Sequence, residues 1–357
     1  MIREAALERR HLFFGDVAVG FHRAEHRLDQ EPARIFGAYF AAEHFSQKAH
    51  VPSLEGFDGI TGEIAFATAA RVRHGFAVCR ISAAGVPCYD GCVGGFSRGL
   101  IFPALTLVPV WVGLVGIRAG VGERVMIALA VGGALFCQLG LERVLTYRRD
   151  WRLRATRRLR ADTAYLALAI ATGIVLDVVA IAAVYELAAL LSVWFGGTLW
   201  PTSWSLPLQL VLAILVADFG HYWAHRALHD VPALWRYHEL HHRPDHLHAL
   251  NFFRMHPVEI ALKTLANVTP LILLGAPHEV LALWTIISGV SAGSVNHANI
   301  VMPTRWLDGW FSTPALHRVH HSRSPAERGN LGNVTMIYDR LFGTHRRPTR
   351  DVEVVGT

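Results

Sequence analysis

The hydrophobic pattern of the chain changes abruptly near Arg98. Before this point apolar and polar residues mix without a sustained run or a clear period, so residues 1–97 are expected to form a poorly structured N-terminal segment. After it, two uncharged runs, residues 101–117 and 125–141, are joined by a short polar connection. Each run approaches the length needed to cross ~30 Å of hydrocarbon. This pattern predicts a transmembrane helical hairpin.

Further apolar stretches follow the hairpin. Residues 163–195 are long enough for one tilted crossing plus an interfacial turn, although Asp177 and Glu186 interrupt them and leave a re-entrant hairpin as the alternative. Residues 208–216 begin a return crossing, and residues 260–295 contain two apolar stretches separated by a Gly-Ala-Pro break. We therefore predict an all-α fold, an integral membrane bundle of about four to six membrane helices.

Arginine is concentrated between two of the apolar stretches, and this gives the bundle an orientation. Residues 147–160 read YRRDWRLRATRRLR, a density of positive charge typical of a cytoplasmic loop. The opposite end of the next helix, GGTLWPTSWSLP, has no Lys or Arg and contains two Trp residues, as a non-cytoplasmic interface would. The chain then returns to the cytoplasmic side near His221 and again near His297. We expect a multi-pass protein with a helical cap on its cytoplasmic side.

The overall composition supports insertion into a membrane. Hydrophobic residues make up 52% of the chain and charged residues only 17%, with a formal net charge of +6. A basic chain can bind nucleic acid, but these arginines lie beside apolar runs and do not alternate with aromatic residues on a polar face. We therefore expect no nucleic-acid partner and interpret residues 148–160 as a topology determinant that contacts lipid headgroups.

Histidine is strongly clustered, since fifteen of the 21 histidines lie between residues 221 and 345. In DFGHYWAHRALHD they recur every four residues, which forms one stripe on a helix. YHELHH and LHRVHH share the spacing HxxHH, which places three imidazoles on one helical face. These clusters contain His221, His225 and His229; His238, His241 and His242; and His317, His320 and His321.

Flanking residues support a helix at each HxxHH cluster. Pro244 should end the helix that carries the first of them. At the other, Thr313 is expected to cap the helix, with Pro314 in its first turn and Pro325 as terminator. The imidazoles should therefore be held on short, well-defined helices.

This number of histidines predicts two metal ions. Imidazole suits iron, zinc or copper, and one ion accepts about six donors at most. His297, at the end of a membrane helix, is a further candidate on the same side. Carboxylates that accept the remaining ring N–H would stabilise such a centre, and Asp218, Glu239, Asp245 and Glu259 are close enough in sequence to do so.

The order HRALH, HELHH, RMHPVE, NHANI, HRVHH and NLGNVTMIYDRLFGT resembles the fatty acid hydroxylase and sterol desaturase superfamily of membrane di-iron proteins. The resemblance covers about residues 218–344. Asn330-Leu331-Gly332 and Tyr338-Asp339-Arg340 stand where members commonly have Asn-Tyr-Gly and Trp-Asp-Arg. We therefore divide the chain into residues 98–211, which carry transmembrane helices, residues 212–345, the di-iron domain that the resemblance implies, and residues 346–357, a C-terminal tail.

The resemblance also implies an activity and its ligands. It implies hydroxylation or desaturation of a sterol or fatty acyl lipid in the membrane, with dioxygen, two iron ions and electrons from a separate donor, a ferredoxin or a b-type cytochrome with its reductase. Zinc is the alternative occupant in isolated protein. The implied metal ligands are His225, His229, His238, His241, His242, His297, His317, His320 and His321. Candidates for additional ligands, or for partners of the ligands, are His221, His256, Asp218, Glu239 and Glu259.

Other interpretations of the histidines remain open. His238-Glu239-Leu240-His241-His242 also matches HExxH, in which Glu239 would be the base of a membrane zinc protease. The second HxxHH has Arg318 in place of this glutamate, and one zinc ion cannot use both clusters. A non-enzymatic metal-binding membrane protein is the third possibility, but its ligands would be expected near the bilayer midplane. His246 and His248 are expected on a solvated turn, and His278 and His345 away from any metal.

Overall fold

The computed structural model describes residues 98–153, 157–347, 352 and 354–357. The expected N-terminal segment, residues 1–97, lies outside this part. Extended structure in the described ranges is limited to isolated bridges, such as the one between Thr146 and Ile300, and everything else that is regular is helical. The predicted all-α class is confirmed.

The predicted hairpin is formed by α5 (Ile101–Arg118) and α6 (Glu123–Val144), which pack against each other. Large apolar side chains on this pair point outward, with Trp111 64% and Phe136 80% exposed. In water such exposure would be costly, whereas hydrocarbon accepts it. The hairpin is therefore built to face lipid.

The next apolar stretch is one long helical run. It comprises α7 (Arg157–Leu176), a π-helical segment η2 (Asp177–Ile181) and α8 (Ala182–Phe195). The run of 39 residues continues without reversal, so it is a single helical run and not a re-entrant hairpin. The interfacial turn expected within it is absent. Asp177, which interrupts the apolar pattern, forms an ion pair with Arg124 at 2.8 Å.

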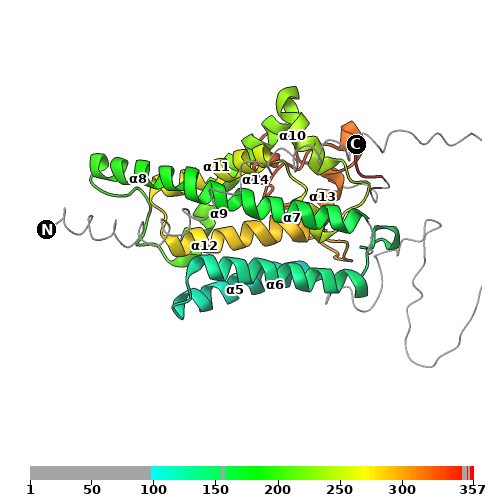
Figure 1. The fold of residues 1–357 in the computed structure, drawn as a ribbon, viewed down its shortest axis with the longest axis horizontal. Helices are drawn as coiled ribbons and strands as arrows, with labels where there is room; N and C mark the ends of the chain where they lie inside the picture. Colours follow the sequence, from blue (N-terminus) through cyan, green and yellow to red (C-terminus); the bar gives the residue numbers. More distant parts are fainter. Residues whose placement is uncertain (1–97, 154–156, 348–351, 353) are drawn as a thin grey trace, which may run out of the picture. The chain divides into compact units, whose positions relative to one another are not determined.

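Two further long helices, α9 (Leu206–Asp230) and α11 (Pro257–Leu274), complete the five candidate membrane spans, within the predicted range. They approach closely at Gly220, where a Cβ would lie 1.9 Å from the Ala266 carbonyl oxygen. α12 (His278–Ile287) continues as the π-helical segment η4 (Ser288–Val295) and packs against α5, α6 and α9. Figure 1 shows α12 between the α5–α6 pair and α7. Most of its side chains are buried, so it forms the centre of the bundle.

The other described helices are short. They are η1 (Arg149–Trp151), α10 (Pro232–His242), η3 (Ala249–Phe253), α13 (Pro314–His320), η5 (Pro325–Glu327) and α14 (Ile337–Leu341). Figure 1 shows α10 and α13 toward one end of the bundle. As predicted, α10 ends just before Pro244, and Thr313 caps α13 by accepting a hydrogen bond from the Leu316 N–H.

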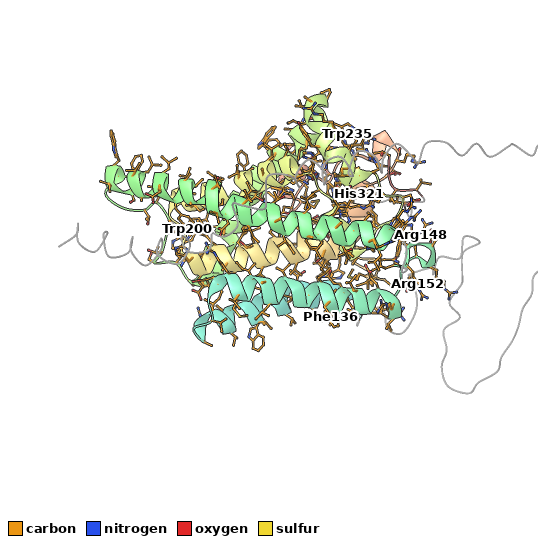
Figure 2. The ribbon with its side chains drawn as sticks, viewed as in Figure 1. Phe136, Arg148, Arg152, Trp200, Trp235 and His321 are labelled. Atoms are coloured by element: carbon orange, nitrogen blue, oxygen red, sulfur yellow. The ribbon has the colours of Figure 1, made fainter. Side chains whose placement is uncertain are left out.

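The two ends of the bundle differ in the residues they carry. Figure 2 shows Arg148 and Arg152 at one end and Trp200 at the other, with His321 toward the arginine end. Arg318, in the helix of the third histidine cluster, lies with its guanidinium 4.1 Å from the ring centroid of Tyr147. The basic connection and the histidine clusters thus occupy the same end, as the distribution of charge predicted.

Candidate metal centre

Nine histidines converge in two groups at this end of the bundle, and they are the nine that the sequence singled out as ligands. Within each group one ring nitrogen of every residue lies within 4.8 Å of the others. The first group contains His225 and His229 from α9, His238 and His242 from α10, and His320 from α13. The second group contains His241 from α10, His297 from the segment after η4, and His317 and His321 at α13.

Each HxxHH cluster is divided between the two groups. In α10, the residues at i and i+4, His238 and His242, join the first group, and His241 joins the second. In α13 the assignment is reversed, because the i and i+4 residues lie in the second group and His320 lies in the first. The groups meet where the rings of His242 and His321 stack at 4.2 Å. The repeated spacing therefore builds two adjacent sites.

Hydrogen bonds at Nδ1 orient several of the imidazoles with Nε2 toward the group centres. The Nδ1–H of His225 donates to the Leu331 carbonyl at 2.9 Å, and that of His320 donates to the Gly329 carbonyl at 2.7 Å. His238 donates from Nδ1 to the buried Glu259 carboxylate at 2.8 Å. Such outer partners fix the tautomer of a metal-binding histidine.

The second group contains the same arrangement at His297. Its Nδ1–H donates to the Asn251 side-chain oxygen at 3.0 Å, while its Nε2 is buried without a hydrogen-bond partner. His320 Nε2 is likewise buried and unpartnered. Buried polar atoms without hydrogen-bond partners are rare in folded proteins, and atoms that bind a metal ion are among the exceptions.

The distances between nitrogens fit a cation at each group centre. His225 Nε2 and His238 Nε2 are 3.0 Å apart, and both rings have their N–H engaged elsewhere. Two lone pairs therefore face each other, which is unfavourable unless a cation lies between them. His317 Nε2 and His321 Nε2 are 3.1 Å apart in the second group. Donors bound to one ion at about 2.0–2.1 Å lie at comparable separations.

Burial keeps these imidazoles neutral. Burial lowers the pKa of His320 to about 3. The same direction holds for His238, His241, His242, His297, His317 and His321. A neutral imidazole is the metal-binding form, so the groups are ready to bind ions at neutral pH.

Two buried aspartates hold the segment that supplies the carbonyl acceptors. Asp339 accepts hydrogen bonds from the backbone N–H groups of Leu331 and Gly332, both at 2.7 Å. Asp218 accepts from the N–H of Thr335 at 2.6 Å and from its hydroxyl at 2.9 Å. Asp218, expected to contact a ligand, thus supports the loop beside the centre. The motif at Tyr338-Asp339-Arg340 signalled this part of the chain, but not the role of Asp339.

The other expected partners of the ligands have different positions. Glu259 contacts His238, as expected. His221 lies next to His225 and contacts Asn267 at 3.4 Å, outside both groups. His256 caps α11 by accepting from the Val258 N–H, and Glu239 is half-buried and belongs to neither group.

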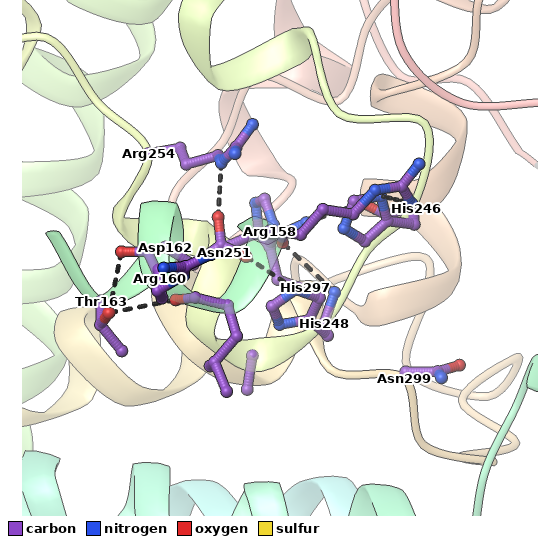
Figure 3. Close-up of polar contacts among 12 residues, drawn as sticks. Arg158, Arg160, Asp162, Thr163, His246, His248, Asn251, Arg254, His297 and Asn299 are labelled. Carbon is purple, nitrogen blue, oxygen red and sulfur yellow. Dashed lines mark hydrogen bonds and ion pairs between the residues drawn. The ribbon is translucent and has the colours of Figure 1, made fainter. Parts of the chain in front are cut away.

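The expectation of a solvated turn at His246 and His248 is wrong. The two side chains are 8% and 1% exposed, because the loop after α10 folds back onto the first turns of α7. His248 Nε2 lies 3.1 Å from a carboxylate oxygen of Asp162, and Figure 3 shows both residues in this region. Asp245, a candidate partner for the ligands, contacts His246 instead.

The geometry does not favour the zinc protease. His238 and His242 do lie together, but they share their group with three more histidines, whereas a catalytic zinc has three protein ligands and an open position. Moreover, the carboxylate that contacts His238 is Glu259 and not Glu239.

Comparisons with known proteins agree with this description. Residues 210–344 match the family model described as fatty acid hydroxylase. The chain is similar to an ornithine lipid hydroxylase of Rhizobium tropici, with 42% identity over 164 residues, 44% of this chain and 49% of the relative. It is similar to an alkylglycerol monooxygenase of Danio rerio, with 30% identity over 48% of this chain and 38% of the relative.

A delta(7)-sterol-C5(6)-desaturase of Nicotiana tabacum is 28% identical over 41% of this chain and 53% of its own length. The chain thus spans about half the length, or less, of these relatives. No solved structure matches it.

Proposed function

Because residues 210–344 match the fatty acid hydroxylase family model, we propose that the protein is a membrane-bound di-iron oxygenase that hydroxylates or desaturates a lipid. The observation that carries the proposal is the convergence of nine buried or half-buried histidines in two adjacent groups. The similar proteins are named for hydroxylation of ornithine lipids, oxygenation of alkylglycerols and desaturation of sterols. The proposed substrate class is therefore a membrane lipid of sterol or fatty acyl type.

The two groups would each hold one iron ion. Iron in such a nitrogen-rich site supplies redox chemistry with dioxygen that can attack an unactivated C–H bond. Glu259 gives the first group a negative charge behind His238, and Lys263 pairs with the same carboxylate oxygen at 2.9 Å. In the second group, Asn251 holds His297 without adding charge. A lysine-paired carboxylate would therefore lie behind one ligand of the first ion, and an uncharged amide behind one ligand of the second.

The chain also positions the reaction relative to the bilayer. His225 and His229 lie in the last turns of a candidate membrane span, so the first group lies where apolar helix gives way to polar segments. A lipid chain that enters between the helices would bring its C–H bonds to this level while burial of the groups excludes water. We place the site on the cytoplasmic side, where a ferredoxin, or a b-type cytochrome with its reductase, would supply electrons.

Lipid profiling tests this proposal. Lipids of cells that express the wild type are compared with those of cells expressing His241→Ala, His320→Ala or His278→Ala. His241 and His320 lie in different groups, whereas His278 is exposed and lies outside both. We expect a hydroxylated or newly unsaturated lipid with the wild type and His278→Ala only, at equal membrane levels of protein. Product formation by His241→Ala or His320→Ala would contradict the proposal.

A further inference from the structure

A third group of metal-binding side chains lies outside the two histidine groups. Asp162 is in the first turns of α7, and His246 and His248 are in the loop between α10 and η3. One donor atom of each lies within 4.8 Å of the other two, and the residues are 0%, 8% and 1% exposed. We propose that these three side chains bind a third metal ion, a divalent ion of the zinc class with a structural role.

The first argument is the state of the donor atoms. Asp162 Oδ2 and His248 Nε2 are 3.1 Å apart, yet both are buried without a properly oriented hydrogen bond. The same separation is found between His229 Nε2 and His238 Nε2 in the first histidine group. Two ligands of one tetrahedral zinc ion lie about 3.3 Å apart when each bond is about 2.0–2.1 Å. The pair is therefore spaced as two ligands of one ion are.

The second argument is the orientation of His246. Its Nδ1 lies 2.6 Å from Asp245 Oδ1, so the N–H donates to a carboxylate and leaves Nε2 as the ligand atom. A carboxylate that fixes a histidine from behind is the common arrangement at zinc sites. It repeats what Glu259 does for His238 in the first group.

Two arginines limit the strength of the site without blocking it. Arg254 pairs with Asp162 Oδ1 at 2.5 Å and leaves Oδ2 free for an ion. Arg158 lies 3.4 Å from Asp245 Oδ1 and at the same distance from His246 Nδ1. Glu142 adds negative charge nearby, since its Oε1 accepts from the Ala249 N–H at 2.7 Å, one residue after His248. The two arginines offset most of the negative charge of the three carboxylates. We therefore expect weaker binding here than in the histidine groups.

The ion would brace the second histidine group. It would join α7 to the loop that continues into Asn251, whose side-chain N–H donates to the His246 carbonyl at 2.7 Å. The oxygen of the same amide accepts the Nδ1–H of His297. Figure 3 shows Asp162, His248, Asn251 and His297 together in this region. A fixed loop therefore means a fixed tautomer at His297.

The test is a zinc titration of the metal-free full-length protein in detergent, in competition with a chromophoric chelator. His248→Ala and Asp162→Asn should each bind one Zn²⁺ equivalent fewer than the wild type. The control His278→Gln, which changes an exposed histidine outside all three groups, should bind the wild-type number. A wild-type count in folded His248→Ala and Asp162→Asn would overturn the third site.

A milder variant decides the case if those substitutions prevent folding. Asp245 has a side chain 60% exposed and supplies no ligand atom to the group. Asp245→Asn should therefore fold and weaken zinc binding at one site by about 10–100-fold, with the other sites unchanged. Unchanged affinity at every site would refute the proposal. Because the readout is zinc binding, the result does not depend on whether the protein oxidises lipids.

Discussion

The Nδ1 of His238 and the Oε1 of Glu259 are 2.8 Å apart, and neither side chain has any exposed surface. This contact joins α10 to α11 and places a carboxylate behind one ligand of the first histidine group. Because both side chains are buried, solvent does not screen this contact. It differs in this from an exposed ion pair, which contributes little to stability. The contact also distinguishes Glu259, which touches a ligand, from Glu239, which the sequence alone offers as an equal candidate.

Glu259→Gln should weaken metal binding in the first group by about 10–100-fold, because the amide accepts the same hydrogen bond without the negative charge. Glu239→Gln is the matched control and should leave metal content unchanged, since Glu239 belongs to neither group. Metal analysis of the purified proteins measures both. The opposite pattern, with metal or activity lost only in Glu239→Gln, would instead support the protease.

Acid should destabilise the metal-free protein. Burial lowers the pKa of His320 to about 3, whereas an unfolded histidine titrates near 6.5, so the unfolded state binds more protons below that pH. The contribution of this imidazole to stability is therefore fully present well above pH 6.5, and it is lost as the pH decreases toward 3. Each such imidazole should cost about 1 kcal/mol between pH 6.5 and 5.5.

Thermal unfolding in detergent and chelator at these two pH values measures this loss. His320→Gln should show a loss smaller by about 1 kcal/mol, because one titrating group is removed. His278→Gln serves as control and should retain the wild-type loss, since His278 is exposed. Equal losses in all three proteins would contradict the prediction.

Asn251→Ala should destabilise the protein by about 1–3 kcal/mol, because it leaves the Nδ1–H of His297 buried without an acceptor. Metal content of the second group should fall as the tautomer becomes free. Gln209→Ala is a suitable control, since Gln209 is also buried but accepts from the Trp200 indole N–H at the opposite end of the bundle. It should change stability without removing metal, and an equal loss of metal in both variants would show that Asn251 has no special role.

Gly220→Ala should separate α9 from α11. A Cβ at this position would lie 1.9 Å from the Ala266 carbonyl oxygen, so the helices must shift, at a cost of about 1–3 kcal/mol. Gly133→Ala in α6 is the control, because no atom lies within 4 Å of the added carbon. Thermal unfolding and metal content compare the two. A stable Gly220→Ala protein with full metal content would indicate that this contact does not position the first group.

Sequence patterns predicted the elements well and their long-range contacts poorly. The α5–α6 hairpin followed from run lengths, and the start of α13 from Thr313 and Pro314, because both depend on neighbours in the chain. The spacing HxxHH could not show that His241 and His242 belong to different groups, since that depends on where α13 lies.

The errors have the same physical origin. His248 lies in a sequence typical of a polar loop, but in the structure it is buried and contacts Asp162, 86 positions earlier in the chain. Asn251 was overlooked because nothing next to it in sequence indicates that it accepts a hydrogen bond from His297. The nearby RMHPVE motif drew attention to His256, which caps a helix.

The division of the HxxHH clusters has a consequence during synthesis. Four of the five histidines of the first group lie between residues 225 and 242, so they leave the ribosome almost together. At that stage the second group has only His241, because its other three members, His297, His317 and His321, are synthesised later. A nascent chain could thus capture one ion early and the other only near the end of translation. Under metal shortage, half-loaded molecules should carry their metal in the first group.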